Sequence, residues 1–228
     1  MQCKNNVNRG VFLENTGCGL CNRKCRVDRD NGEKGFCGET GEIRCGRAAL
    51  HMWEEPCISG TRGSGTVFFT GCVLKCVFCQ NSVLAESKVG KPVTVSRLAE
   101  IFLELQNKGA HNINLVTPTH FVPSIRESII LAKKNGLTLP IVYNTGSYES
   151  VDTIKSLEGL VDIYLPDLKY VSSELSKKYS KAPDYFETAK KAIGEMVRQA
   201  GTPEFDDDGI MKKGVIVRHL LLPGCITD

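Results

Sequence analysis

Apolar and polar positions follow two regular patterns along the chain after residue 60. Short runs rich in apolar and β-branched residues, typical of buried strands, alternate with stretches in which apolar residues recur every three or four positions, typical of amphipathic helices. The runs predict strands over 66–70, 113–116, 141–144, 162–165 and 215–222. The periodic stretches predict helices between 94 and 109, over 123–136 and over 151–160, and a longer helical region over 172–200 with an interruption near Pro183.

This alternation of strands and helices predicts an α/β fold. Parallel strands joined by right-handed βαβ crossovers build either an open doubly wound sheet or a barrel. In both architectures the loops after the carboxyl ends of the strands form the active site. Glycines and polar residues gather at these ends, at 71, 117–119, 144–146, 167–169 and 223–224. The chemistry is therefore expected along this edge of the sheet.

The first 60 residues differ from the rest of the chain. They are rich in Gly, Cys, Asn and charged residues and show little periodicity. The stretch Ser-Gly-Thr-Arg-Gly-Ser-Gly over 59–65 is typical of a flexible join. Two units are therefore predicted, a small cysteine-rich metal-binding segment over 1–60 and an α/β domain over 61–228.

The 228 residues include 11 cysteines, an odd number that cannot pair completely. A chain of this length buries enough surface to fold without disulfides, and its beginning lacks the apolar stretch of a secretory signal. We therefore expect a reducing, cytoplasmic compartment, in which clustered thiols bind metal or do chemistry. No apolar run approaches the roughly 20 residues that span a bilayer, so no membrane is expected as a partner.

Charge is spread evenly along the chain. Residues 1–60 hold nine Lys or Arg against eight Asp or Glu, and the net charge of the whole chain is +3. A protein that binds nucleic acid usually concentrates positive charge on one face. The even distribution therefore argues against nucleic acid as a partner, and against a zinc-ribbon module that would bind it.

Three cysteines follow the first predicted strand. Cys72, Cys76 and Cys79 have the spacing C-x3-C-x2-C, and three thiolates this close can bind one face of a cubane iron–sulfur cluster. A fourth cysteine is missing nearby. A catalytic zinc site keeps one coordination position open, and by the same logic a cluster held by three ligands keeps one iron open for another molecule.

Four further cysteines lie among glycines in the N-terminal segment: Cys18, Cys21, Cys25 and Cys37. Four thiolates with tight turns suit either a tetrahedral zinc ion or a fully ligated iron–sulfur cluster. Their spacing does not separate the two, so both alternatives stay open. A segment this short has little core of its own, and a bound metal would stabilise it. No firm role is expected for the remaining four cysteines: Cys3, Cys45, Cys57 and Cys225.

The C-x3-C-x2-C motif, the Phe78 just before its third cysteine and the order of strands and helices over 60–228 resemble the radical S-adenosylmethionine (radical SAM) superfamily. The resemblance implies a partial (β/α) barrel whose three cysteines hold a 4Fe–4S cluster, with S-adenosylmethionine chelating the open iron. One electron from the reduced cluster cleaves S-adenosylmethionine into methionine and a 5′-deoxyadenosyl radical, which abstracts hydrogen from the substrate. The chain ends after the fifth predicted strand, so the expected barrel lacks its last βα unit.

Two segments carry a closer match to the pyruvate formate-lyase activating enzyme group, in particular to an uncharacterised branch with an N-terminal cysteine-rich segment. They are Trp-Glu-Glu-Pro-Cys-Ile-Ser-Gly over 53–60 and Phe-Phe-Thr-Gly-Cys over 68–72. This match implies an oxidoreductase that activates a glycyl radical enzyme by abstracting hydrogen from a glycine backbone carbon. It also implies an auxiliary iron–sulfur cluster or a structural metal such as zinc. An electron donor such as flavodoxin or ferredoxin is expected as a partner.

The resemblance further implies a set of contacts to S-adenosylmethionine. Asp167 and Lys169 match an Asp-x-Lys element near the methionine carboxylate, and Arg218 matches an arginine on a strand that ends in Pro-Gly. Lysine and arginine suit a carboxylate, and arginine can bind one bidentately. The full set of expected contacts is Phe78, Thr117, Asn144, Asp167, Lys169 and Arg218.

One motif departs from the superfamily pattern. Its members typically carry Gly-Gly-Glu after the second strand, where this chain has Thr-Pro-Thr-His over 117–120. Backbone carbonyls near Thr117 are therefore expected to replace that contact. His120 is expected to be a helix-entry residue rather than an acid or base, and no other side chain is assigned a catalytic role.

Two alternative functions stay open. The same class of enzyme could act on another protein or on a small molecule, because no motif in the sequence identifies the substrate. The chain could instead be a non-catalytic electron carrier with two clusters. A carrier is expected to ligate each cluster fully, and the 72–79 motif does not.

Overall fold

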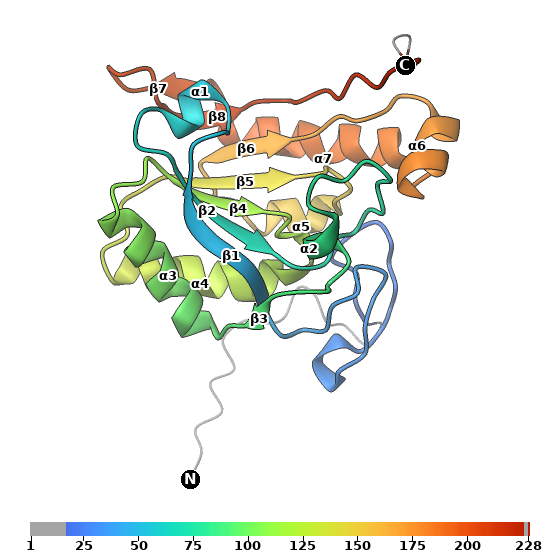
Figure 1. Cartoon of the computed structure of the whole chain (residues 1–228), viewed down its shortest axis with the longest axis horizontal. Coiled ribbons are helices and arrows are strands. Elements are labelled where there is room, and N and C mark those ends of the chain that lie inside the picture. Colours follow the sequence, from blue (N-terminus) through green and yellow to red (C-terminus); the bar gives the residue numbers. More distant parts are fainter. Residues whose placement is uncertain (1–16, 226–227) are drawn as a thin grey trace.

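The computed structural model describes residues 17–225 and 228, which fold around one mixed sheet (Figure 1). The strand order is β3-β1-β2-β4-β5-β6-β8-β7. The middle five strands run parallel to one another: β2 (Ser64–Phe69), β4 (Ile113–Val116), β5 (Ile141–Thr145), β6 (Ile163–Pro166) and β8 (Met211–Val215). Antiparallel strands flank them, β1 (Arg44–His51) and β3 (Lys91–Pro92) at one edge and β7 (Glu204–Phe205) at the other.

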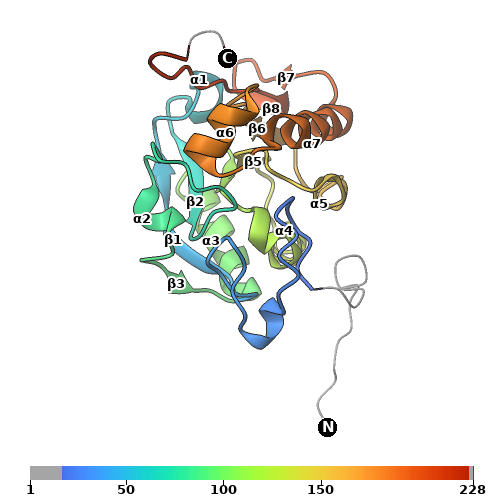
Figure 2. The same cartoon turned by 90° about the vertical axis from the view of Figure 1, so that its right-hand side faces the viewer.

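Four helices line one side of the sheet, as Figure 2 shows from the edge where the parallel strands end. They are α3 (Val95–Asn107), α4 (Val122–Lys134), α5 (Val151–Lys155) and α7 (Tyr185–Ala200). The shorter elements are α1 (Pro56–Ser59), α2 (Ser82–Ala85), α6 (Ser173–Ser180) and two 3-10 turns, η1 (Arg29–Asn31) and η2 (Thr119–Phe121). No helix among the described residues is both long enough and apolar enough to cross a membrane.

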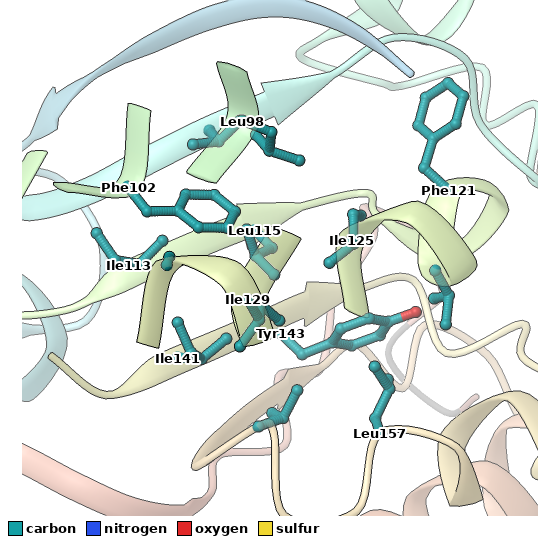
Figure 3. Close-up of a cluster of buried hydrophobic side chains, with 14 of the residues drawn as sticks. Leu98, Phe102, Ile113, Leu115, Phe121, Ile125, Ile129, Ile141, Tyr143 and Leu157 are labelled. Carbon is teal, nitrogen blue, oxygen red and sulfur yellow. The ribbon is translucent and has the colours of Figure 1, made fainter. Parts of the chain in front are cut away.

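The main core lies between the sheet and these helices (Figure 3). On α3 the apolar stripe predicted from the sequence is buried, and Thr94 caps the helix by accepting the Arg97 backbone N–H at 3.1 Å. Leu98 and Phe102 of this stripe pack against alternate strand residues such as Leu115. The α/β prediction and most element boundaries over 94–200 are therefore confirmed.

The opposite face of the sheet carries a smaller apolar cluster and several polar groups. Side chains alternate along β5, so that Tyr143 joins the helix-side core while Val142 faces this second side. Ile58 of α1 covers Val142 from the other direction. Asn144, the next residue on this face, lies at the carboxyl end of β5 and is buried. On this face of the sheet, apolar side chains are therefore followed by polar side chains at the carboxyl ends of the strands.

Three details of the sequence prediction are corrected. β1 was not predicted, because Gly46 and two alanines interrupt any alternation, yet it pairs along β2 within one sheet. The last parallel strand is β8, and the predicted strand over 215–222 is wrong because β8 ends at Val215. Helix α5 ends at Lys155 instead of Leu160, and tight turns follow it from Ser156 to Leu160. Because β1 precedes residue 60, the sheet includes strands from both predicted units, and the division itself stays a prediction.

Candidate functional site

The three cysteines at 72–79 lie on the loop that leaves β2 at the carboxyl edge of the sheet. Figure 1 shows this loop, α6 and the N-terminal segment on the side to which the arrowheads of β4, β5 and β6 point. Gly71 opens the loop with φ +76°, and a Cβ there would lie 2.8 Å from the Cys37 carbonyl oxygen. Only glycine fits such a left-handed, crowded position. The turn therefore brings the loop against the N-terminal segment.

Backbone contacts fix this loop from two sides. The Cys72 N–H donates to the Cys37 carbonyl at 3.2 Å, and the Val77 N–H donates to the Tyr179 carbonyl at 2.9 Å. Arg23 also donates from Nε to the Val73 carbonyl at 2.9 Å. The loop is therefore held between the N-terminal segment and the end of α6.

The thiols of this loop influence one another. Burial is the largest of the effects that raise the pKa of Cys72 to about 12, and the charges of Cys76 and Cys79 contribute to this rise, because neighbouring thiolates repel. Burial also raises the pKa of Cys76, while the Ser180 hydroxyl and the charge of Lys169 lower it. Buried thiols that oppose one another's charge are a donor set that fits a positively charged iron–sulfur cluster.

The described cysteines are all free thiols. In residues 17–225 and 228, no three His, Cys, Asp or Glu side chains converge on a position for a single metal ion. A cubane cluster does not require such convergence, because each of its cysteine ligands binds a different iron. The arrangement of Cys72, Cys76 and Cys79 is compatible with such a cluster. Their assignment as its ligands stays a prediction.

Four predicted contacts come together at the ends of β5 and β6. Arg218 donates from Nε to Asp167 Oδ1 at 2.8 Å and from Nη2 to Asn144 Oδ1 at 2.6 Å. Lys169 donates from Nζ to the other oxygen of Asp167 at 2.6 Å. Arg218 lies beyond β8, and its backbone bridges to Asp167. An incoming carboxylate would share these two cations with Asp167.

This network adjoins the cysteine loop. A Cβ on Gly146 would lie 3.0 Å from Leu74 of the loop and 3.8 Å from Lys169 Cε. The charges of Lys169 and Asp167 both act on the pKa of Cys76. The cysteine loop and the cationic side chains therefore lie next to each other at the carboxyl edge, as a ligand that binds both would require.

Two acidic residues of this site were not predicted. Glu54 Oε2 and Glu55 Oε1 each lie 3.6 Å from Arg218 Nη1, and Asn144 Nδ2 donates to Glu54 Oε2 at 3.4 Å. Burial raises the pKa of Glu54, which Arg218 lowers. Asn114 of β4 is fully buried, and neither of its amide atoms has a hydrogen-bond partner within the described residues. The adjacent glutamates just before Pro56 were the available signal.

Phe78 and Thr117 occupy different parts of this edge. The Phe78 ring packs against Tyr170, with ring centroids 6.4 Å apart. Thr117 has φ +58°, a left-handed conformation that is uncommon for threonine, and its N–H donates to the Asn144 carbonyl at 2.9 Å. Such strained positions concentrate at functional sites. Whether either residue contacts S-adenosylmethionine stays a prediction.

The four N-terminal cysteines also gather in one place. A Cβ on Gly35 would lie 3.5 Å from Cys25 Sγ and 3.7 Å from Cys37 Sγ, so this glycine sits between two sulfurs. The Phe36 N–H donates to Cys25 Sγ at 3.2 Å. Burial is the largest of the effects that raise the pKa of Cys21 to about 12, and the charges of Glu149, Cys18 and Cys25 contribute to this rise. These thiols, all within the described residues, lie near one another, but no three of them converge on a position for a single metal ion, so a second cluster or a zinc ion at this place stays a prediction. Cys3 lies outside the described residues.

His120 is buried and holds the start of the cysteine loop. Its Nε2 donates to the Thr70 carbonyl at 2.6 Å, and burial together with the charges of Arg29 and Lys75 lowers its pKa to about 3. The neutral imidazole is therefore a structural donor. The unfolded chain binds a proton near pH 6.5 and the folded chain does not, so this group stabilises the fold above that pH and less as the pH falls.

The His120 titration is expected to lower the free energy of unfolding by about 2 kcal/mol between pH 7 and pH 5, at about 1.4 kcal/mol per pH unit below pH 6.5. Glu149, whose pKa burial raises to about 7, takes up a proton in the folded chain over the same range and acts in the opposite direction. His120→Gln keeps a donor and removes only the His120 titration, so its stability relative to the wild type should rise by about 2 kcal/mol from pH 7 to pH 5. The measurement is urea denaturation of both proteins at pH 5, 6 and 7, and equal slopes would contradict the assignment.

Comparisons with known proteins bear on this site. The family described as "Radical SAM superfamily" matches residues 66–224, which include the cysteine loop and all six expected cofactor contacts. An uncharacterized protein of Methanocaldococcus jannaschii is 30% identical over 223 residues, covering 92% of this chain and 59% of that protein. The chain therefore spans less than two thirds of the length of this relative.

Proposed function

The chain belongs to the radical SAM superfamily, and we propose that it cleaves S-adenosylmethionine reductively to activate a glycyl radical enzyme. When bound, a cluster would supply the one electron that splits S-adenosylmethionine into methionine and a 5′-deoxyadenosyl radical, and that radical would remove a hydrogen from a glycine backbone carbon. The observation that carries the proposal is that the cysteine loop and the network of Arg218, Asp167 and Lys169 meet at one edge of the sheet, where Leu74 of the loop and Lys169 both lie beside Gly146.

The residues of this chain would bind and orient the two groups. Cys72, Cys76 and Cys79 would hold the cluster and leave one iron for the amino and carboxylate groups of S-adenosylmethionine. Arg218 and Lys169 would orient that carboxylate, since both present donors at the edge. The loop contacts to Cys37 and Tyr179 keep the cysteines rigid, which preserves the geometry between cluster and cofactor.

The N-terminal cysteines would hold an auxiliary iron–sulfur cluster or a zinc ion. We also propose that the curved parallel strands form the partial barrel typical of the family. The electron would come from a low-potential protein donor such as flavodoxin or ferredoxin, in the cytoplasm. These parts of the proposal rest on the resemblance to the pyruvate formate-lyase activating enzyme group.

The proposed function is tested with anaerobically reconstituted protein, dithionite and S-adenosylmethionine. We expect 5′-deoxyadenosine and methionine in equal amounts, measured by liquid chromatography and mass spectrometry. Adding a glycyl radical enzyme from the same genome should produce an organic radical in the electron paramagnetic resonance (EPR) spectrum, split by the remaining glycine hydrogen. The same enzyme with its radical glycine changed to alanine is the control.

Different outcomes separate the alternatives. Cleavage without a radical on the partner would support action on another protein or on a small molecule. Iron near eight atoms per chain, as two cubane clusters contain, together with no cleavage would support the two-cluster electron carrier. Absence of both cluster and cleavage would contradict the proposal as a whole.

A further inference from the structure

Two buried hydroxyl groups lead to the sulfur of Cys76. The Ser180 hydroxyl donates to Cys76 Sγ at 2.9 Å, and the Tyr170 and Ser180 hydroxyl oxygens lie 2.8 Å apart. Ser180 is 0% exposed and Tyr170 is 1% exposed. Since the single Ser180 proton is donated to the sulfur, the Tyr170 hydroxyl must donate to Ser180. The chain of donors therefore runs in one direction, from Tyr170 through Ser180 to Cys76.

The position of Ser180 is fixed by its surroundings. It is the last residue of α6, and Lys181 then leaves the helix in a left-handed conformation with φ +55°. Its carbonyl accepts the Lys75 N–H at 3.4 Å and Arg23 Nη2 at 3.3 Å. The Tyr170 ring is held edge-on to Tyr185, with centroids 5.5 Å apart. Both hydroxyls are therefore placed by packing rather than by chance rotation.

A donor to a ligand sulfur changes how easily a cluster accepts an electron. Part of the added electron resides on the cysteine sulfurs, and a hydrogen bond to a more negative acceptor is stronger. The reduced state is then stabilised more than the oxidised state. Hydrogen bonds to the sulfurs are accordingly among the factors that set cluster potentials. A chain of two hydroxyls strengthens this effect, because each bond polarises the next.

We propose that Ser180, polarised by Tyr170, raises the reduction potential of the cluster bound by Cys72, Cys76 and Cys79. Ser180 is a positioning residue, since it acts on the cluster through the sulfur of Cys76. This inference rests on the proposed function for the presence of the cluster. It goes beyond it by assigning a tuning role to two side chains outside the cysteine motif.

The test is the midpoint potential of the cluster, measured by EPR during anaerobic redox titration of the reconstituted full chain. Ser180→Ala should shift the midpoint to a more negative value, because the reduced state loses its donor. We expect the equilibrium constant for one-electron reduction to fall about tenfold, equal to about 59 mV. Ser180→Thr retains the hydroxyl and should keep the wild-type midpoint.

A matched control lies one turn away on the same helix. Ser176 is 1% exposed, and its hydroxyl donates to the Ser173 carbonyl at 3.1 Å within α6. Ser176→Ala removes a buried serine hydroxyl without touching a cysteine, so its midpoint should equal that of the wild type. Tyr170→Phe should shift the midpoint in the same direction as Ser180→Ala, but by less.

The outcomes separate this inference from the proposed function. If the wild type holds no cluster, the proposed function fails. If the wild type and Ser180→Ala both hold the cluster with the same midpoint, the inference fails while the function stands. Where Ser180→Ala does not retain its cluster, Tyr170→Phe decides: a negative shift supports the tuning role, and an unchanged midpoint overturns it.

Discussion

Replacing Cys76 with alanine is expected to abolish 5′-deoxyadenosine formation. In the proposed cluster Cys76 is the middle of three ligands, and the two remaining thiolates of the loop would not hold a cubane. Changing a group that merely supports a metal ligand typically costs about 10–100-fold in metal affinity or activity. Loss of a ligand itself should exceed this. We therefore expect a loss of more than about 100-fold in turnover, together with loss of the iron of this cluster.

The measurement compares Cys76→Ala with a cysteine outside the site. Cys45 lies on β1, is partly buried and donates weakly from Sγ to the Arg47 carbonyl at 3.4 Å. Cys45→Ala should retain both iron and turnover. Iron content and 5′-deoxyadenosine are measured on the two variants side by side. Turnover that persists in Cys76→Ala would remove the cluster assignment from this loop.

Replacing Arg218 with lysine is expected to weaken the binding of S-adenosylmethionine. The guanidinium binds Asp167 and Asn144 at once, and Glu54 lies near its third nitrogen. Lysine keeps the charge but cannot reproduce this fork. Loss of one charge-assisted hydrogen bond of about 1.5 kcal/mol corresponds to a roughly tenfold increase in the dissociation constant.

Equilibrium dialysis with labelled S-adenosylmethionine and the oxidised, cluster-loaded protein measures this change without turnover. Arg198→Lys provides the matched control, because Arg198 also pairs with two carboxylates but lies exposed on α7. Its dissociation constant should equal that of the wild type. An unchanged constant for Arg218→Lys would show that the carboxylate of S-adenosylmethionine binds elsewhere.

The parts of the fold with strong local signals could be predicted from the sequence. Helix α3 has a cap, an apolar stripe and a glycine after its end, and β4 is a short apolar run between turns. β1 carries no such signal, because its pairing with β2 depends on a partner distant in sequence. β8 contains two lysines beside the edge strand β7, so its partly exposed pattern does not distinguish it from a loop.

The same distinction holds for the candidate site: its local features could be predicted from the sequence, and its long-range contacts could not. The cysteine spacing is local, and polar residues at strand ends follow from the topology of a parallel sheet. Glu54 reaches Asn144 across 90 positions, and Ser180 reaches Cys76 across 104 positions. Neither contact leaves a periodic pattern in the sequence. Such contacts depend on where the segment before α1 and the end of α6 lie in the folded chain, which only the three-dimensional structure shows.

The central claim is that three cysteines leave one iron open and that S-adenosylmethionine occupies it. Electron–nuclear double resonance on the reduced cluster tests this directly, with S-adenosylmethionine labelled at its amino nitrogen and carboxylate oxygens. Coupling of the cluster spin to both labels is the expected result. A cluster that is present and reduced but couples to neither label would contradict an open iron at Cys72, Cys76 and Cys79.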